Sequence, residues 1–337
     1  MDDKAEVTME YPMISVVVLF YNSEAYAVRT LDALVSQTYK NLEILCVDDG
    51  STDRTGAIID QYAEKYENVK ALHKENGGSS STRNYGIQHA KGEYVGFLDG
   101  DDAVENDIYE ILYSLLSKHH TDIAMVNADY MTEDGKSHGP VFDFEEGIIS
   151  NERQLDLLLQ HKGCSAVWNC LFKREFLEKN LFDESKGNED FLFWIRIIPQ
   201  FDTIYFKNVI RYHYYLHEGS ISRSGFSKDI IDMVNNTWEA KELVERSYPQ
   251  LSEVMDRFFM YQRLIYLEFI PLDLMRAEDN HYMSVMNDLK QYESKIDSNR
   301  YLTRRQKFLL HQFIHHPERS RRYIGLRESL RKLIKRY

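Results

Sequence analysis

The sequence has few cysteines and no long apolar run. Its three cysteines, Cys46, Cys164 and Cys170, form no closely spaced pair. This spacing argues against a disulfide framework or a cysteine-based zinc site and favours a reduced, cytosolic protein. No stretch of about 18 apolar residues occurs, so a transmembrane helix is not expected. The first twelve residues are acidic and lack an apolar core, unlike a signal peptide. We therefore expect a cytoplasmic protein.

Basic charge is also scarce. The chain has 41 Lys and Arg against 54 Asp and Glu, a net charge of −13. Nucleic-acid binding needs a basic surface, so this balance argues against it.

The exception is the tail, residues 319–337, which carries eight Lys and Arg residues. At helical spacing its apolar residues fall on one face: Tyr323, Leu326, Leu330, Leu333 and Tyr337. The pattern predicts an amphipathic helix with two alternative roles. It binds anionic lipid peripherally, at the inner face of the cell membrane, or it docks on its own domain with a solvated basic face.

Apolar β-branched runs alternate with helical patterns in the first third of the chain. Strands are predicted at 14–20, 42–47, 69–73 and 93–98, with helices at 27–35, around 58–62 and at 82–90. This alternation predicts an α/β fold with a mostly parallel sheet flanked by helices.

Further strands are predicted at 122–127 and 166–172, and segments 204–206 and 209–216 are expected to pair with each other. From about residue 227 onward only helical patterns occur. We therefore place a domain boundary near 222, with an α/β domain at 1–222 and a helical C-terminal region at 223–337.

Three carboxylates, Asp99, Asp101 and Asp102, follow the strand at 93–98. A strand period of two would put Asp99 and Asp101 on one face and Asp102 on the other. Neighbouring carboxylates at the end of a buried strand are costly to desolvate, and a divalent cation or a turn of amide donors would relieve that cost. An acidic turn without a ligand is the alternative, and Asp102 is expected to cap the next helix.

Six motifs occur in a fixed order along residues 13–223: VVVLFYN, SQTYKNLEILCVDDGSTD, GGSSSTRNYGI, KGEYVGFLDGDD, GNEDFLFW and EGSIS. Together they resemble the inverting glycosyltransferases of family 2, which have the GT-A fold. The resemblance implies a Rossmann-like domain that binds a nucleotide-sugar donor, with a UDP-sugar as the expected one. It also implies transfer to a hydroxyl of a glycan or lipid-linked acceptor in surface polysaccharide synthesis.

The resemblance implies a donor-binding role for five residues. Tyr21 and Asn22 would lie against the nucleotide base, and Asp49 would accept a hydrogen bond from the uracil ring. Asp48 would contact the ribose or serve the structure, and Arg83 would reach pyrophosphate or base oxygens, which suits the planar guanidinium. The alternatives are an interdomain packing aromatic at Tyr21, a helix-capping turn at Asp48 and Asp49, and a surface arginine.

Asp99 and Asp101 fill the DxD positions of that family. The resemblance implies Asp101 as a direct ligand of Mg²⁺ or Mn²⁺, with Asp99 nearer the ribose or the waters of the metal. Asp190 is predicted as the general base and Glu189 as a second candidate. The alternative for this pair is helix capping, which carboxylates at a helix N-terminus favour anyway.

Two positions depart from the family pattern: Cys170 stands where a Lys is common, and Tyr215 stands where an Arg is usual. Residues that would compensate, by contacting diphosphate or metal, are His213, His217, Ser220 and Ser222.

Two other functions stay open. A sugar nucleotidyltransferase would have a Gly-rich, basic phosphate loop after its first strand, where this chain has Phe20, Tyr21 and Asn22. A non-catalytic nucleotide-sugar-binding subunit would keep Asp49 and Asp101 without needing Asp190. The sugar, the acceptor and the oligomeric state, including a homo-oligomer, are also open.

Overall fold

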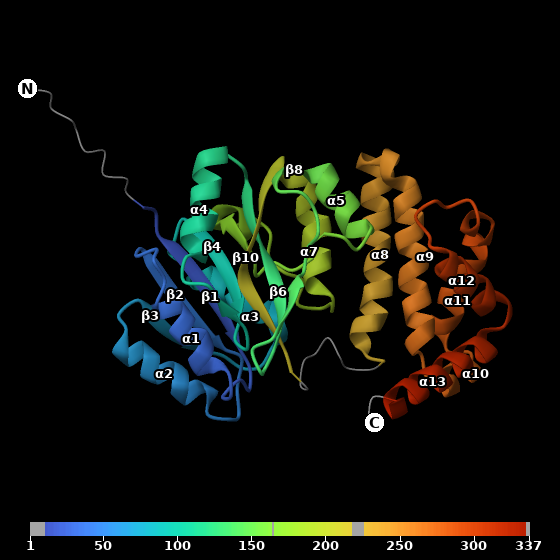
Figure 1. The fold of residues 1–337 in the computed structure, drawn as a ribbon, viewed down its shortest axis with the longest axis horizontal. Helices are drawn as coiled ribbons and strands as arrows, with labels where there is room; N and C mark the ends of the chain where they lie inside the picture. The colour runs from blue at the N-terminus through green and yellow to red at the C-terminus, as the bar shows by residue number, and fades with distance from the viewer. Residues whose placement is uncertain (1–10, 164, 218–225, 335–337) are drawn as a thin grey trace, which may run out of the picture. The chain divides into compact units, whose positions relative to one another are not determined.

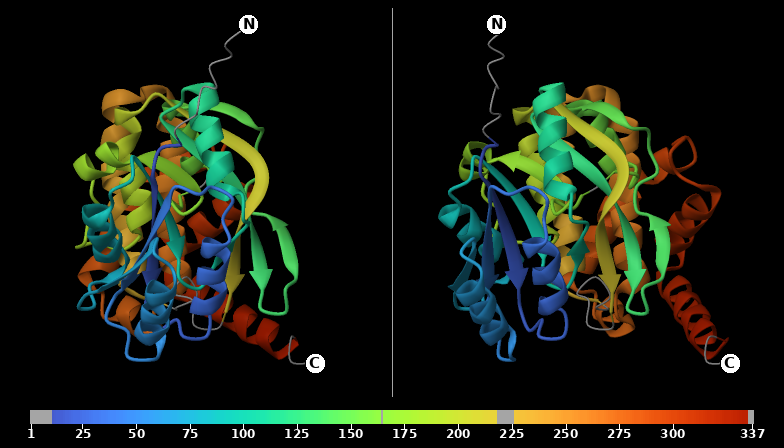
Figure 2. Two further views of the ribbon diagram at one scale, coloured as in Figure 1. Left: turned by 90° about the vertical axis from the view of Figure 1, so that its left-hand side faces the viewer. Right: turned by 60° about the vertical axis from the view of Figure 1, so that its left-hand side comes forward.

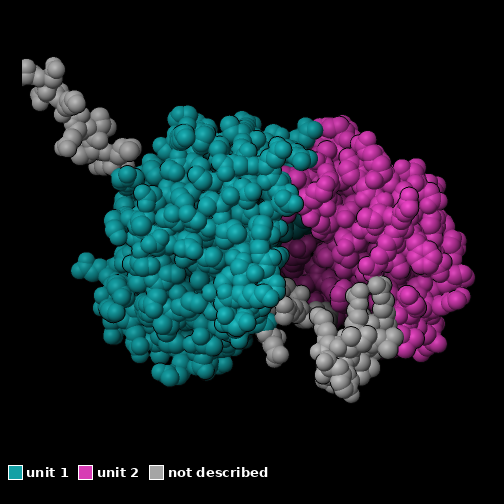
Figure 3. Space-filling view, viewed as in Figure 1, with its two compact units in different colours: residues 1–153, 164–184, 189–217 teal, residues 154–163, 185–188, 218–337 magenta. Residues whose placement is uncertain are grey.

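The computed structural model describes residues 11–163, 165–217 and 226–334. The chain divides into two compact units (Figure 3). Unit 1 comprises residues 1–153, 164–184 and 189–217, and unit 2 comprises residues 154–163, 185–188 and 218–337. The boundary predicted near residue 222 and the motif at 218–222 lie outside the described residues.

The described residues of unit 1 form a ten-stranded mixed sheet (Figures 1 and 2). Its strands are β1 (Ile14–Phe20), β2 (Leu42–Asp48), β3 (Val69–His73), β4 (Tyr94–Asp99), β5 (Ala103–Val104), β6 (Ile123–Thr132), β7 (Ser137–Pro140), β8 (Gly147–Ser150), β9 (Cys170–Lys173) and β10 (Thr203–Leu216). The order is β3-β2-β1-β4-β9-β6-β10-β5, with β7 on β6 and β8 on β10. Strands β1 to β4 are parallel, and β9 runs antiparallel between β4 and β6. The predicted α/β fold with a mostly parallel sheet is confirmed.

Helices flank this sheet on both faces. They are α1 (Ala27–Val35), α2 (Thr55–Lys65), α3 (Gly78–His89), α4 (Ile108–His119), α6 (Arg174–Lys179) and α7 (Glu189–Ile197), and α5 (Asn151–Leu159) begins in unit 1 and continues into unit 2.

Strand β1 is covered on both faces of the sheet. Val16 of β1 is the register partner of Gly96 of β4, so these two residues face one side of the sheet and Val17 faces the other. A Cβ at Gly86 of α3 would lie 2.2 Å from Val17, and one at Gly96 would lie 2.8 Å from Tyr109 of α4. Because α3 and α4 cover opposite faces, β1 reads as an unbroken apolar run.

Two strand predictions are wrong. Residues 166–169 form a turn, in which Cys170 donates to the carbonyl of Val167, and β9 begins only at Cys170. Segments 204–206 and 209–216 do not pair with each other. They are one strand, β10, which pairs with β6 through register shifts between Lys207 and Tyr212. The interruption in the apolar pattern is therefore an irregularity within a strand and not a hairpin turn.

Unit 2 is helical where the structure describes it, as predicted. Its helices are α8 (Lys228–Ser247), α9 (Ser252–Phe269), α10 (Leu272–Arg276), α11 (Asn280–Ile296), α12 (Arg304–His315) and α13 (Pro317–Ile334). Helix α9 packs against α8, α11, α12 and α13, and much of its surface is buried. Within the described ranges, no helix combines the length and apolarity that crossing a membrane requires.

The turn after β4 is pressed against the end of β1. Gly100 donates its N–H to the carbonyl of Leu19 at 2.8 Å. A Cβ at Gly100 would lie 2.4 Å from the ring of Phe20 and 2.5 Å from the Leu19 carbonyl, where no side chain fits. The glycine therefore allows the close approach that puts Asp99 and Asp101 beside the end of β1.

Candidate active site

A buried arginine holds three carboxylates together in unit 1. Arg83 lies on α3, and its Nη1 is 2.9 Å from Oε1 of Glu189 and 3.1 Å from Oδ1 of Asp190. Its Nη2 is 3.7 Å from Oδ1 of Asp99, at the end of β4. Four of the predicted site residues thus meet at the carboxyl edge of the sheet, where open α/β sheets bind ligands.

Three carboxylates surround one guanidinium, and the pKa values of two of them are raised. Burial raises the pKa of Asp190 to about 7, against the opposing charge of Arg83 and with support from Glu189 and Asp99. Burial also raises the pKa of Asp99 to about 6, again opposed by Arg83 and reinforced by Asp101. Burial tends to lower the pKa of Arg83, but its three carboxylate neighbours raise it above the ordinary value. The cluster therefore exchanges protons near neutral pH, as acid–base sites do.

Glu189 and Asp190 occupy the first turn of α7. The positive end of the helix dipole favours carboxylates there, so the helix-terminus explanation predicted as the alternative also applies. It does not account for Arg83, whose side chain is only 4% exposed. A pair that served only the helix end would not need a buried guanidinium.

The second aspartate of the turn contacts a histidine and an unpredicted arginine. Nε2 of His217 lies 2.5 Å from Oδ2 of Asp101, and the Tyr26 ring stacks on His217 with centroids 4.9 Å apart. Arg29 donates to the backbone carbonyl of Asp101, and its guanidinium lies 3.5 Å from the centroid of the Tyr215 ring.

Arg29 brings a cation to the position where the family pattern usually has one. The sequence has Tyr at 215, but Arg29 of α1 lies over that ring. The available signal was the spacing of Tyr26 and Arg29, which puts them on one side of a helix. Spacing within a helix does not reveal which strand end that side faces, so sequence reasoning missed this residue.

The sequence led us to expect that Asp102 caps the next helix. The structure shows that it does not, because Asp107 is at the N-cap of α4. The hydroxyl of Tyr212 donates to its Oδ2 at 2.7 Å, and the backbone N–H of Tyr215 donates to its Oδ1 at 2.8 Å. Strand β4 ends at Asp99, so strand alternation does not extend to Asp102. Burial, followed by Asp101 and Asp99, raises its pKa well above the ordinary value. Asp102 thus ties the acidic turn to β10.

The predicted residues after β1 and β2 are engaged with neighbouring turns. Asn22, with a φ of 47°, accepts from the N–H of Thr52 at 2.8 Å. The Asp48 carboxylate accepts from the N–H of Ser51 at 3.0 Å and lies 3.1 Å from Nδ1 of His73. These contacts fix the two strand ends relative to each other.

The Asp49 carboxylate holds the loop that begins α3. It accepts from the N–H groups of Gly77 at 2.9 Å and Gly78 at 2.8 Å and forms an ion pair with Lys74. Tyr21 is different, because the residue is 53% exposed directly after β1. Its exposure leaves the side chain open to a base.

Asp99, Asp101 and His217 offer two carboxylates and an imidazole. Carboxylate oxygens suit Mg²⁺ and Mn²⁺, and an imidazole is compatible with Mn²⁺. Nε2 of His217 contacts Oδ2 of Asp101, but the ligand atoms of the three residues do not converge on one point in the described part of the chain. The residue types therefore suit a divalent cation, although their side chains would have to move together to bind it.

A separate cavity of about 270 Å³ lies where β6 begins, at the end of the sheet opposite the carboxyl ends of the parallel strands. Asp122 and Ile123, at the start of β6, and Lys173, at the end of β9, line it. No predicted site residue contributes to its lining, so it plays no part in the site around Arg83.

The fold and the acidic turn place the protein in a structural class. The solved structure of S. aureus TarS 1-349 in complex with UDP-GlcNAc matches with a TM-score of 0.71 at 20% identity, over 95% of this chain and 92% of that one. This match confirms the predicted GT-A type of fold.

The family follows from the sequence relatives. The model of glycosyl transferase family 2 matches residues 15–181. Glycosyltransferase GlyG of Streptococcus pneumoniae is 33% identical over 66% of this chain and 78% of GlyG. The chain therefore belongs to glycosyl transferase family 2, as predicted. A longer match, at 27% identity, covers 94% of this chain and 36% of the minor teichoic acid biosynthesis protein GgaB of Bacillus subtilis. The matched regions span only 31% of S. pneumoniae GlyA and 52% of B. subtilis EpsJ.

Proposed function

We propose that the protein is an inverting glycosyltransferase that moves a sugar from a UDP-sugar to a hydroxyl of a glycan or lipid-linked acceptor. The observation that carries the proposal is Asp190, whose pKa is raised to about 7 while Arg83 lies 3.1 Å away. The UDP-GlcNAc complex of TarS and the teichoic acid role in the name of GgaB support this donor and acceptor class.

Asp190 acts as the general base. As the acceptor oxygen attacks the anomeric carbon, its proton passes to the Asp190 carboxylate and a new C–O bond forms. The bond from the anomeric carbon to the phosphate oxygen breaks on the opposite face, and its electron pair leaves with the UDP. A pKa of about 7 keeps much of Asp190 deprotonated at neutral pH while leaving it basic enough to accept the proton.

Other residues bind and orient the donor. Arg83 holds the Asp190 carboxylate in place, and Tyr21 stacks on the base. Arg29, over Tyr215, supplies positive charge beside the diphosphate. Asp101, Asp99 and His217 would hold Mg²⁺ or Mn²⁺, which stabilises the negative charge of the leaving group when it is bound.

The test is UDP release from a panel of UDP-sugars in the presence of Mn²⁺ and acceptor. Asp190→Asn should lower kcat by about 10²–10⁴-fold, because the base is lost, and leave UDP affinity unchanged. Glu189→Gln tests the second candidate base and should lower kcat less than Asp190→Asn does. For the wild type, kcat/KM should rise with pH through about 7, as Asp190 loses its proton.

Other outcomes point to the alternative functions. Metal-dependent UDP binding without transfer from any donor would favour a non-catalytic binding subunit. Formation of a nucleotide sugar from a sugar phosphate and a nucleoside triphosphate would favour a nucleotidyltransferase. Full activity in Asp190→Asn would exclude Asp190 as the base.

We also propose that α13 binds the anionic membrane surface peripherally. The helix packs on α9 and α10, as the docking alternative requires, yet Tyr323 and Leu326 are 62% and 67% exposed. Flotation with phosphatidylglycerol vesicles should decrease in the variant Tyr323→Ser/Leu326→Ser and persist in Phe308→Ser, a comparably exposed control on α12. Unchanged flotation of the double variant would exclude this role.

A further inference from the structure

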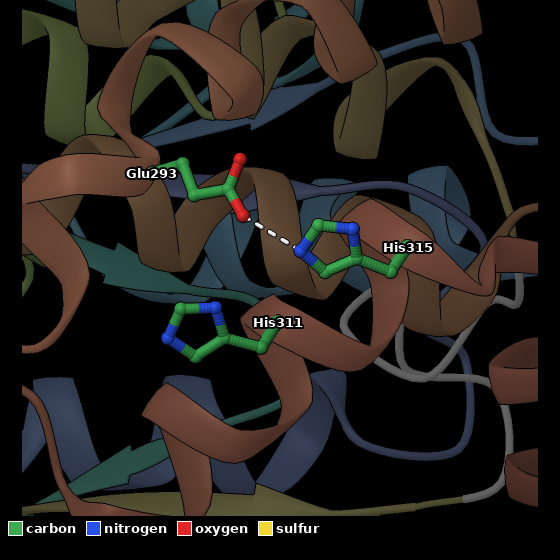
Figure 4. Close-up of side chains that lie close together, drawn as sticks. All are labelled: Glu293, His311 and His315. Carbon is green, nitrogen blue, oxygen red and sulfur yellow. Dashed lines mark ion pairs between the residues drawn. The ribbon is translucent and has the colours of Figure 1, made fainter.

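Two histidines and a glutamate lie close together in unit 2, whereas the residues of the proposed active site belong to unit 1 (Figure 4). His311 and His315 are four residues apart on α12 and therefore share a face. Glu293 of α11 faces them, and its Oε1 is 2.7 Å from Nε2 of His315. One ligand-type atom from each of the three lies within 4.8 Å of the others, and no comparable cluster of three His, Cys, Asp or Glu occurs in the described part of the chain.

The helices that carry these side chains are firmly held. A capping box of Thr303 and Gln306 starts α12, and the buried side chains of Leu310 and Phe313 pack its inner face. Leu289, one turn before Glu293, is fully buried on α11. The three side chains therefore project from a preformed helix pair, which reduces the cost of ordering them around an ion.

We propose that Glu293, His311 and His315 bind Zn²⁺ and join α11 to α12. Two imidazoles and a carboxylate suit zinc, whereas Mg²⁺ prefers an all-oxygen set. At zinc bond lengths of about 2.0–2.1 Å, tetrahedral ligand atoms lie about 3.4 Å apart. The three side chains are 32–57% exposed, so each has room to rotate as the ligand atoms draw together around the ion.

A second carboxylate supports the histidines. Oδ1 of Asp297 lies 3.1 Å from Nε2 of His311. Carboxylates in contact with metal-binding histidines orient the ring or add a ligand, and their loss typically weakens binding by about 10–100-fold. Because all four residues belong to unit 2, a bound ion would stabilise that unit.

Calorimetric titration of the full chain with ZnCl₂ tests the proposal. The variant His311→Ala/His315→Ala should lose about a hundredfold or more in affinity for one zinc equivalent, because two ligands are removed. Glu293→Gln should weaken binding less, and His316→Ala, the next histidine on the chain, is the control and should bind as the wild type does. Circular dichroism verifies that each variant is folded, and the exposure of these side chains favours folding.

Zinc bound at Asp101 and His217 must be distinguished from zinc at this cluster. Anomalous diffraction at the zinc edge from crystals soaked in ZnCl₂ should give a peak between Glu293, His311 and His315. The variant Asp101→Asn should still bind the one zinc equivalent that the variant His311→Ala/His315→Ala loses. Equal affinity in the wild type and the double variant, or anomalous density elsewhere only, would overturn the proposal. The cluster would then be a surface ion pair.

Discussion

Arg83 of unit 1 and Arg263 of unit 2 are both buried, and they differ in how their charges are balanced. Arg83 of unit 1 faces Glu189, Asp190 and Asp99. Arg263 of unit 2 is fully buried and forms an ion pair with Asp288, its Nη2 lying 2.7 Å from Oδ2. Unit 1 thus gathers an excess of negative charge, and unit 2 has a matched pair.

The rest of the Arg263 environment is neutral. Its Nη1 donates to the hydroxyl of Thr237 at 3.0 Å and to the carbonyl of Phe259, whose ring centroid lies 3.2 Å from the guanidinium. Burial lowers the pKa of Arg263 to about 10, whereas carboxylates raise that of Arg83. The difference teaches that burial of a charge does not mark a functional site. A functional site is marked instead by an unbalanced set of buried charges, which a ligand or a proton would neutralise.

The largest effect on stability is expected from Arg83→Met. It leaves three clustered carboxylates without their cation, which should destabilise unit 1 by about 3–5 kcal/mol. The chain has three tryptophans, of which Trp168 and Trp194 lie in unit 1 and Trp238 in unit 2. Urea unfolding in a Trp238→Phe background therefore reports unit 1 by fluorescence. An unchanged midpoint would show that the carboxylates are protonated or solvated without cost.

A smaller loss, about 2–3 kcal/mol, is expected in unit 2 from Arg263→Met, because the remaining Asp288 is 14% exposed and partly solvated. Trp238 reports it, since its ring lies 4.9 Å from that of Phe259. Adding Asp288→Leu should restore stability, since replacing a matched pair by apolar side chains is often neutral. No recovery in the double variant would mean that the pair is needed for more than charge balance.

A pH dependence of opposite sign is also expected in the two units. Asp99 and Asp190 have raised pKa values of about 6 and about 7, so the stability they contribute is present at low pH and lost as pH rises through those values. Burial lowers the pKa of His281 in unit 2, so its contribution is present above about pH 6.5 and lost as pH falls.

Between pH 5 and 8, unit 1 should weaken while unit 2 gains or keeps stability. Urea midpoints from the Trp238→Phe variant, compared with those from Trp168→Phe/Trp194→Phe, measure the two trends separately. Parallel trends in the two units would contradict the prediction. The Asp190→Asn variant should reduce the slope for unit 1.

Local patterns in the sequence were enough to predict the parallel half of the sheet and the helical region. The runs at 14–20 and 42–47 end within one residue of β1 and β2. The errors came where a long-range partner decides the structure. Strand β10 continues through the break in its apolar pattern because β6 pairs with it along its length. Residues 166–169 form a turn in spite of their mostly apolar side chains.

The site was predicted through motifs, and only in part. Arg83, Asp99, Glu189 and Asp190 were all named, but their meeting depends on one strand end and two helices that are far apart in sequence. Arg29 carries no motif, and its contact with Tyr215 spans 186 positions, which periodicity cannot detect. Asp102 was misassigned because its partners Tyr212 and Tyr215 lie on β10, more than a hundred residues away.

The tight fit of Gly100 against β1 limits how this protein can diversify. In the DxD pattern the middle position is written as open to any residue, but here it faces the Leu19 carbonyl and the Phe20 ring at distances that exclude a Cβ. A library randomised at position 100 should therefore return glycine almost alone among active clones. In laboratory evolution toward a new donor, adaptive substitutions would have to arise elsewhere, since the backbone of this turn leaves no room for them.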